Sequence, residues 1–511
     1  MDNINDRASS PLRLLYFGFT DEVTHRAVRP ILETFNVTYC EYYYDEPRDL
    51  GRKIAGKGHF YIDVQKGDYK VDWNKLAPLD EKLLDALAHC ESTVMRMFDR
   101  NDIWAPLPYA ERKALYLKHV RYWADCLDRN QINLTLFSGI PHGSFDYIVY
   151  VLCKLKNIPT LVFSCQSLWM DTSFLTQDID DPAPDLAVRF KQLCEQVSPE
   201  ERSRVVLAEW SERQFQKMTD IQSDQTPFYM KNPIWKRPFD REQEGWLQKI
   251  RRIAKSPSIL LKGVKADYWI GKLRFRREWQ EQDNEFRDVV AFYNEQAHPV
   301  DMTRRFIYVP LHLQPECTTC PMGGAFVEQQ LMVQLLAAAA PPDVLIYVKE
   351  HPMQDKYGVV SRSRVFYQDL LDVPNVRLVP RGTSTYALMK NCAAISTATG
   401  AAGWEALFRQ KPYLMFGHHV YQYAPGVLPV DDLASCRAAI DAVFHNGFFP
   451  RIEDLRLFFK AIEETAIRGY AQGNRREASM VSDDENVANL TSALLHKIED
   501  IGFSRNHVNP L

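Results

Sequence analysis

The C-terminal half of the chain alternates short apolar runs with helical segments, and this alternation constrains the fold more than any other sequence feature. Apolar runs this short, separated by helices, are typical of strands buried on both faces of a parallel sheet. The apolar runs span residues 306–310, 344–348, 376–379, 393–395 and 412–416, and the helical segments span 323–340, 383–390 and 401–409. The pattern predicts a doubly wound parallel sheet covered by helices.

A second α/β region precedes it. The apolar runs at residues 12–17 and 132–137 and the β-rich run at 37–44 read as strands. A turn at 138–144 then leads into an amphipathic helix over 145–156 and another run at 160–163. Strand, turn, helix and strand form a βαβ unit, which places the turn at the carboxyl edge of a sheet. We therefore expect an α/β protein with two Rossmann-like domains.

The expected organisation has four parts: a Rossmann-like domain at 1–180, a helical and basic insertion or interdomain segment at 181–300, a second Rossmann-like domain at 301–446, and helices at 447–511 that pack back across the domains. Residues 231–277 hold 14 Lys and Arg against 4 Asp and Glu, a local net charge of +10. A surface that meets anionic lipid or an anionic acceptor is one interpretation. A solvated helical face is the favoured one.

Composition and net charge argue against several classes of protein. The 511 residues are 46% hydrophobic and 25% charged, so the chain can bury enough apolar surface to fold. A net charge of -4 argues against a general nucleic-acid binder. The polar, acidic start carries no secretory signal, and no apolar run is long enough to cross a membrane. With 10 scattered cysteines, a cytoplasmic location is expected.

Polar and small residues follow the C-terminal strands at the edge where open α/β sheets bind ligands. In the segment after 393–395, small residues allow close approach of a ligand, and the following helix start attracts an anion. A capped helix packed tightly on its strand is the competing interpretation. The segment is neither a P-loop nor a GxGxxG motif. The candidate nucleotide-binding residues at this edge are His351, Pro352, Ser396, Thr397, Thr399, Gly400, Gly403 and Glu405.

The candidate catalytic residues come from both regions. The turn that contains His142 and Asp146 follows the strand at 132–137, and a general base needs an imidazole or carboxylate of this kind within reach of the acceptor hydroxyl. Asp146 is the expected base, and it is equally explained as a partner of the helix dipole. Glu316 follows the strand at 306–310 and is the third candidate.

No metal site is expected. Cys317 and Cys320 form a CxxC pair, but zinc would need two further ligands, and the sequence has no second CxxC and no HxxxH. Loop cysteines without a special role are the favoured interpretation. The acidic loop with Asp178 and Asp180 is more simply a solvated loop.

Three segments resemble the capsule polysaccharide biosynthesis glycosyltransferases, including relatives of bacterial 3-deoxy-D-manno-octulosonate (Kdo) transferases: 306–330, 347–352 and 396–412. The His-Pro pair and the later Ser/Thr segment also look like the two motifs of bacterial sialyltransferases and polysialyltransferases. The resemblance is good over about 300–430, thin over 1–180, and does not include 180–300.

The resemblance implies a GT-B fold, with the acceptor on the side of the N-terminal domain and the nucleotide sugar held mainly by the C-terminal one. It implies contact with the nucleotide by His351, Ser396 and Thr397, and with the ribose by Glu405. The implied activity is transfer of a sugar from a CMP- or UDP-linked donor to a glycan or glycolipid hydroxyl, without a metal or other cofactor. Residues 231–277 would then meet the inner membrane surface.

Two alternatives stay open from the sequence. One is a nucleotide-sugar 2-epimerase of GT-B architecture, which needs no acceptor. The other is a non-catalytic scaffold of a polysaccharide assembly complex, which would bind no nucleotide.

Overall fold

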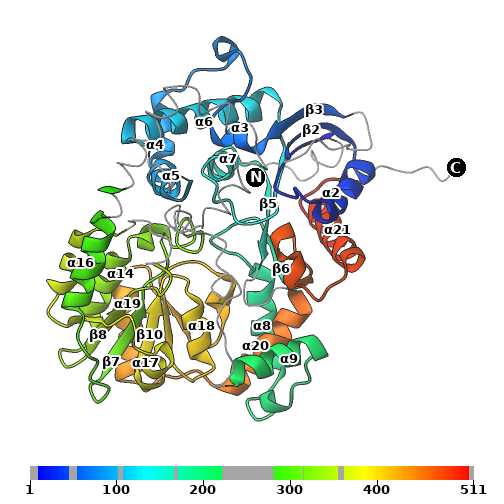
Figure 1. Ribbon diagram of the computed structural model, residues 1–511. Coiled ribbons are helices and arrows are strands. Elements are labelled where there is room, and N and C mark those ends of the chain that lie inside the picture. Colours follow the sequence, from blue (N-terminus) through cyan, green and yellow to red (C-terminus); the bar gives the residue numbers. More distant parts are fainter. Residues whose placement is uncertain are drawn as a thin grey trace, which may run out of the picture.

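The computed structural model describes residues 10–44, 54–101, 107–165, 171–220, 280–281, 284–314, 316–354 and 362–505. These residues build two α/β halves, one at the top and one at the lower left of Figure 1, with a helical group beside them at the lower right.

The C-terminal half contains a six-stranded, all-parallel sheet in the order β12-β11-β10-β7-β8-β9. Read from β9, the chain order is that of a Rossmann sheet, and it reverses between β7 and β10. The strands are β7 (Phe306–Pro310), β8 (Leu345–Lys349), β9 (Val376–Val379), β10 (Ala394–Thr397), β11 (Tyr413–Met415) and β12 (Val427–Pro429).

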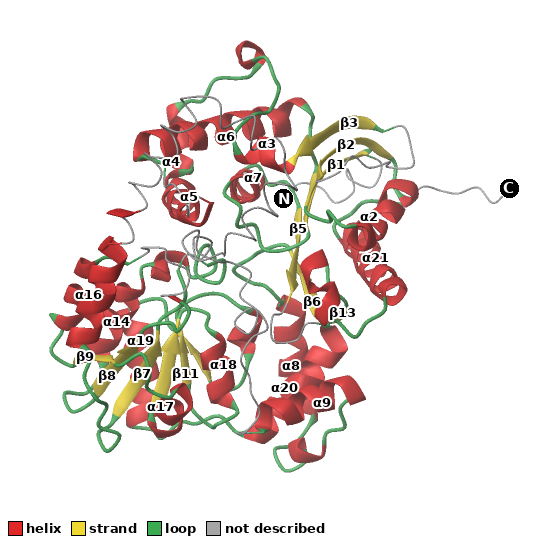
Figure 2. Cartoon of the chain, in the orientation of Figure 1, coloured by secondary structure: helices red, strands yellow, loops and turns green. Residues whose placement is uncertain are grey.

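Helices cover both faces of this sheet (Figure 2). On one face, the helix over 284–296 joins α14 (Gln329–Ala339), α16 (Arg364–Leu371) and α19 (Leu433–Phe444) in one buried core. On the other face, α17 (Thr385–Asn391) and α18 (Ala401–Leu407) pack with helices from outside the sheet's own segment. Single 3-10 turns lie at η4 (Gly324–Val327) and η5 (Val420–Tyr423).

The N-terminal half contains a seven-stranded sheet in the order β13-β6-β5-β4-β1-β2-β3. From β5 to β3 the strands are parallel and again follow the Rossmann order, with its reversal between β1 and β4. Strand β6 pairs antiparallel with β5, and β13 antiparallel with β6. The strands are β1 (Leu12–Phe17), β2 (Val37–Tyr44), β3 (Ala55–Phe60), β4 (Leu134–Phe137), β5 (Thr160–Cys165), β6 (Thr172–Thr176) and β13 (Ile467–Arg468).

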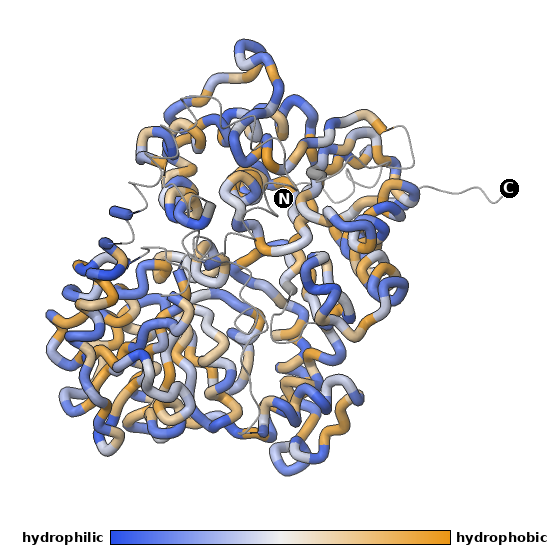
Figure 3. The backbone as a smooth tube through the Cα atoms, in the orientation of Figure 1, coloured by the Kyte–Doolittle hydropathy of each residue, from blue (hydrophilic) through white to orange (hydrophobic). Residues whose placement is uncertain are grey.

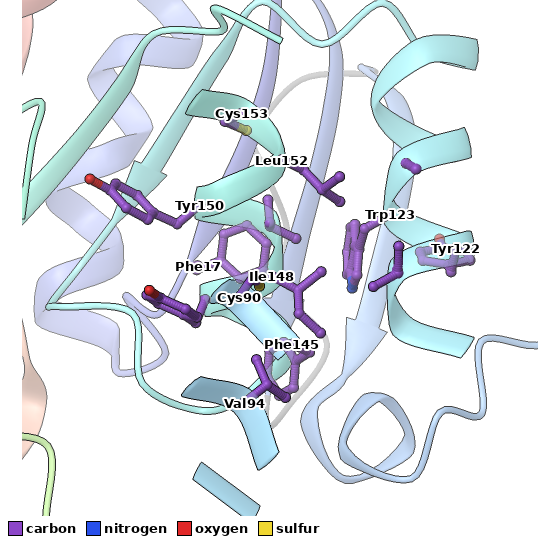
Figure 4. Close-up of a cluster of buried hydrophobic side chains, with 14 of the residues drawn as sticks. Phe17, Cys90, Val94, Tyr122, Trp123, Phe145, Ile148, Tyr150, Leu152 and Cys153 are labelled. Atoms are coloured by element: carbon purple, nitrogen blue, oxygen red, sulfur yellow. The ribbon is translucent and has the colours of Figure 1, made fainter. Parts of the chain in front are cut away.

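One face of this sheet carries a large aromatic core, shown in Figure 4. Phe17 of β1 stacks on Phe137 of β4, and Trp123 of α6 is fully buried beside them. The helical elements on this side are α3 (Tyr61–Gln65), η1 (Trp73–Lys75), α4 (Glu81–Ala86), α5 (Ala88–Asn101), α6 (Tyr109–Arg129) and α7 (Phe145–Leu155).

The opposite face is covered by α2 (Glu22–Thr34) and by α21 (Asp483–Asp500), which lie side by side in Figure 1 although they come from opposite ends of the chain. Strand β13 also comes from the C-terminal segment and extends the N-terminal sheet. The last part of the chain therefore completes the first half of the fold.

A helical group joins the two halves. Helix α20 (Ile452–Thr465) packs against α8 (Pro184–Gln196) and α9 (Glu209–Thr219) in the core that also covers α18. The ion pairs Arg202–Asp454 and Arg456–Glu212 cross this group. The remaining 3-10 turns are η2 (Arg202–Arg204) and η6 (Gly473–Ala478). Figure 3 colours the backbone by hydropathy, and hydrophobic and hydrophilic residues alternate along many of its segments.

The expected fold class is confirmed: the chain is α/β, with two Rossmann-like, doubly wound sheets and C-terminal helices. Strands 12–17, 37–44, 306–310 and 376–379 have the predicted bounds. The predicted helix at 323–340 divides into η4 and α14, and the other predicted strands and helices have bounds that differ by one or two residues. The four-part division of the chain stays a prediction, and the basic stretch 231–277 lies outside the described residues.

We predict that Leu494→Ala lowers the free energy of unfolding by about 2–5 kcal/mol, because Leu494 of α21 is fully buried and its truncation leaves a cavity under the N-terminal sheet. Urea unfolding followed by circular dichroism measures this. The control is His496→Ala on the same helix, where a largely exposed side chain should give a change within about 0.5 kcal/mol. Equal effects of the two substitutions would contradict the placement of α21.

Candidate functional site

The reversal point of the C-terminal sheet is bridged by a hydrogen bond. His312 follows β7, and its Nε2 accepts from the backbone amide of Thr399, which follows β10, at 3.2 Å. The amide of His312 donates to the side chain of Gln329 at 2.7 Å. Burial lowers the pKa of His312 to about 3, so the imidazole is neutral at neutral pH and its proton is on Nδ1. His312 therefore fixes the turn after β10.

A buried ion pair organises the loops beside it. Glu350 and Arg362 are each at most 5% exposed and are joined by a bond of 2.7 Å. The Glu350 carboxylate also accepts from the amide of His351 at 2.6 Å and from the hydroxyl of Tyr367. The other arm of Arg362 donates to the carbonyl of His312. One guanidinium thus holds the loops after β7 and β8 together.

Two glutamines complete this network. The amide of Gln314 donates to the side chain of Gln354 at 2.9 Å, and Gln354 donates back to the carbonyl of Gln314 at 3.0 Å. Arg362 also donates to Gln354, at 3.1 Å. Polar groups this deeply buried are stable only when paired, and these are.

Only one ring nitrogen of His351 has a hydrogen-bond partner among the described residues. Its Nδ1 accepts from the amide of Met353 at 3.2 Å, so the proton of the neutral ring is on Nε2. Burial, with the charges of Arg362 and Lys349, lowers the pKa of His351 to about 4. Among the described residues no hydrogen-bond partner for Nε2 occurs. His351 is therefore a neutral donor at the carboxyl edge of β8, next to the exposed Pro352.

The predicted hydroxyls are engaged within the protein. Ser396 donates to the carbonyl of Leu414 at 3.1 Å, and Thr397 bonds the hydroxyl of Tyr413 at 2.9 Å. Thr399 donates to the carbonyl of Thr318. All three side chains are at most 2% exposed. They build the turn, and their direct contact with a nucleotide stays a prediction.

The remaining predicted residues of this segment also have packing roles. The amide of Gly400 donates to the hydroxyl of Thr397 at 2.6 Å. A Cβ on Gly403 would lie 2.3 Å from the ring of Tyr413, so only glycine allows α18 to approach β11 this closely. Glu405 is buried on α18. For much of this segment, these contacts therefore agree with a capped helix packed tightly on its strand, which is the interpretation that competes with ligand binding.

The N-terminal sheet has its own reversal point, between β1 and β4. A Cβ on Gly18 would lie 1.8 Å from the Oγ of Ser138, so the two strand ends touch here. The turn after β4 leads to His142 and Asp146. The Asp146 carboxylate accepts from the amides of Gly143 and Tyr147 at 2.7 Å and of His142 at 3.3 Å. These contacts give Asp146 the structural role that competed with catalysis.

His142 meets the C-terminal half at Cys317. The ring Nδ1 of His142 lies 2.5 Å from the carbonyl oxygen of Ile140, and the Cys317 thiol lies close enough to act electrostatically on the ring. Cys317 raises the pKa of His142 to about 9 against the effect of burial. Burial alone would raise the pKa of Cys317, but His142 and Arg100 outweigh it and lower that pKa.

Arg100 of α5 ties the two halves together at this point. It donates to the carbonyl of His142 at 2.7 Å and to the carbonyl of Cys320 at 3.2 Å. Glu316 lies in the same loop as Cys317 and accepts from the hydroxyl of Thr318 at 2.9 Å. Burial raises the pKa of the Glu316 carboxyl, against the effects of Thr318 and Arg100. The structure thus gathers His142 and Glu316 around Arg100.

Sequence reasoning did not select Arg100, Arg362 or Arg475. Arg100 lies on α5 and Arg362 in the loop before α16, and no local sequence pattern marks either residue. Arg475 lies in the segment between β13 and α21; it donates to Gln472 at 3.1 Å, and its charge acts on His419 after β11. A Cβ on Gly139, after β4, would lie 2.1 Å from Gln472. The C-terminal segment therefore runs beside the edges of both sheets.

The described residues contain neither a membrane-spanning helix nor a metal-binding cluster of side chains. No helix there is both long and apolar enough to cross a membrane. No group of three or more His, Cys, Asp or Glu side chains there is arranged to hold a metal ion. In the acidic loop, the carboxylate of Asp178 forms an ion pair with the ammonium group of Lys154 at 3.1 Å. That the reaction needs no metal stays a prediction.

The segment that forms the C-terminal sheet is similar to a known protein family. Residues 292–439 match the family of capsule polysaccharide biosynthesis proteins. The resemblance seen in the sequence is thereby confirmed, over the part of the chain that carries β7 to β12 and their loops. No curated protein matches the chain by sequence.

Solved structures of nucleotide-sugar enzymes are also similar, at low identity. A UDP-GlcNAc 2-epimerase from Methanocaldococcus jannaschii is 10% identical over 89% of this chain and 99% of its own, with a TM-score of 0.24. KpsC of Thermosulfurimonas dismutans, a β-Kdo 2,7 transferase, is 10% identical over 79% and 96%, with a TM-score of 0.28. Anabaena Alr3699/HepE, bound to UDP and glucose, is 9% identical over 96% and 100%, with a TM-score of 0.21. These scores are low, so the fold assignment rests on the two sheets themselves.

We predict that Glu350→Gln lowers the free energy of unfolding by about 3–5 kcal/mol, because it leaves the buried Arg362 guanidinium without a counter-charge. Urea unfolding measures the change. The matched control is Asp343→Asn, which breaks the exposed Arg305–Asp343 pair and should cost less than about 1 kcal/mol. A loss below about 1 kcal/mol for Glu350→Gln would show that the ion pair does not organise the edge.

Proposed function

We propose that the chain is a glycosyltransferase of surface polysaccharide biosynthesis, which moves a sugar from a CMP- or UDP-linked donor to a glycan or glycolipid hydroxyl. The observation that carries the proposal is the family match over 292–439, because the matched residues form the sheet whose edge gathers His312, Glu316 and His351.

On the donor side, His351 is the residue proposed to meet the leaving phosphate. Its Nε2–H is a neutral donor held by the bond from Met353, so it needs no rearrangement when charge develops on the phosphate. The turn of Ser396, Thr397 and Thr399 is proposed to shape the nucleotide pocket through its backbone. Glu405 is the proposed ribose partner.

On the acceptor side, Glu316 is proposed as the general base. Burial raises the pKa of its carboxyl, which brings it toward the range in which a carboxylate takes a proton efficiently. His142 carries a proton at neutral pH, because its pKa is raised to about 9. It therefore suits stabilisation of negative charge, and Asp146 supports its turn.

A thermal-shift panel with CMP, UDP, GDP and ADP tests the donor assignment. A nucleotide at about 100 times its dissociation constant should stabilise the wild type by roughly 2.7 kcal/mol. His351→Ala should lose most of this shift, whereas His445→Ala, an exposed histidine on the far end of α19, should keep it. If no nucleotide shifts the wild type, the nucleotide site is wrong and the scaffold alternative is favoured.

The substitution Glu316→Gln tests the proposed role of Glu316 as the general base. The amide cannot accept the acceptor proton, so we expect kcat to fall about 10²–10⁴-fold while the nucleotide shift stays. Release of free nucleotide with a glycan acceptor is the measurement. Interconversion of the sugar nucleotide without acceptor would instead establish the epimerase alternative, and unchanged turnover would remove Glu316 from the mechanism.

A further inference from the structure

The loop from Glu316 to Val327 belongs to the C-terminal half but packs into the core of the N-terminal half. Cys320 and Met322 are buried in the cluster that contains α5, α6 and α7, and Cys317 and Val327 pack against it. Cys320 is 2% exposed, and its thiol donates to the carbonyl of Thr93 at 3.5 Å. Cys317 is half-buried. Both thiols of the CxxC pair therefore contact the opposite half of the molecule.

The two cysteines lie in one turn of chain. The amides of Thr319 and Cys320 both donate to the carbonyl of Glu316, at 3.3 and 3.0 Å. In a helical turn, the Cβ atoms of residues three apart are about 5–6 Å from each other, whereas a disulfide needs a Cβ separation of about 3.5–4.5 Å, so the turn has to tighten for the bond to form.

His142 is placed to act as a base toward Cys317. The Nδ1 of His142 bonds the carbonyl of Ile140, so Nε2 is the nitrogen left to take the thiol proton. The charged groups that face the pair are Arg96, Asp99 and Arg100 from α5, Asp146 at the start of α7, and Glu316 in the same loop. His142 and Arg100 favour the thiolate of Cys317, the reactive form of cysteine, against burial and Glu316, whereas burial keeps Cys320 in the thiol form.

We propose that Cys317 and Cys320 form a peroxide-sensitive thiol pair, in which Cys317 is the nucleophile and His142 of the opposite half is its base. This inference does not depend on the proposed transferase activity. It assigns a modification site to a motif that neither the fold nor the family match explains.

The chemistry balances with hydrogen peroxide as oxidant. The Cys317 thiol gives its proton to His142, the thiolate sulfur attacks one peroxide oxygen, the O–O bond breaks, and the departing hydroxide takes that proton from His142 to form water. The Cys320 sulfur then attacks the resulting sulfenic acid, the S–S bond forms, the S–O bond breaks, and the hydroxyl leaves with the Cys320 proton as a second water. Two thiols lose two electrons, and one peroxide is reduced to two waters.

The disulfide would change the contact between the halves. It withdraws the Cys320 thiol from Thr93 and the Cys317 thiol from His142, while the bonds of Arg100 to the backbone remain. The oxidised protein should therefore be less stable than the reduced one, in contrast to disulfides that only restrain the unfolded chain.

The test treats the reduced full-length protein with hydrogen peroxide and follows each cysteine by alkylation and mass spectrometry. Cys194 on α8 is the internal control, because it is also half-buried but lacks an imidazole, and burial raises its pKa. We expect Cys317 to react about tenfold faster than Cys194 at pH 7, and to yield an intramolecular bond to Cys320. Cys320→Ser should stop at a sulfenic acid that a dimedone probe traps.

His142→Gln should slow Cys317 about tenfold and leave Cys194 unchanged. Because this substitution can disturb the turn, the wild-type alkylation profile against pH is measured as well: Cys317 should reach its plateau at a lower pH than Cys194. Equal rates for Cys317 and Cys194, equal pH profiles, or an oxidised product without the Cys317–Cys320 bond would each overturn the proposal.

Discussion

The buried ion pair between Glu350 and Arg362 is the interaction on which the C-terminal edge depends. Loops after parallel strands have no ladder to hold them, and this one pair fixes two of them through His312, His351 and Gln354. A buried charge pair is a costly way to gain stability, but its directional bonds hold loops in one arrangement. The neutral state of His312 and His351 follows in part from the same guanidinium, since its charge lowers both pKa values.

The arrangement of the two sheet edges also depends on contact between the N-terminal and C-terminal halves. Arg100, His142 and the loop after β7 join the carboxyl edge of the N-terminal sheet to that of the C-terminal one. The C-terminal segment reinforces this contact, because β13 and α21 are built into the N-terminal half while α20 packs on the other. The residues at these edges thus come from segments far apart in the chain.

The strands buried on both faces were predictable, since Leu12–Phe17 and Phe306–Pro310 are continuous apolar runs. Strand β3 (Ala55–Phe60) was not, because its sequence AGKGHF has neither an apolar run nor alternation. At the site, the positions of His351 and Glu316 after strands could be predicted, but their partners could not. Whether Ser396 meets a ligand or the carbonyl of Leu414 depends on the neighbouring strand, which no local pattern shows.

The central claim is that the edges of the two sheets form one nucleotide-sugar site. Amide hydrogen exchange with and without the stabilising nucleotide tests it directly on the wild-type chain. We expect slower exchange in the loops after β7, β8 and β10, at residues 311–314, 350–354 and 398–400, together with the turn 138–143 when acceptor is added. Protection confined to other surfaces, or none at saturating nucleotide, would contradict it.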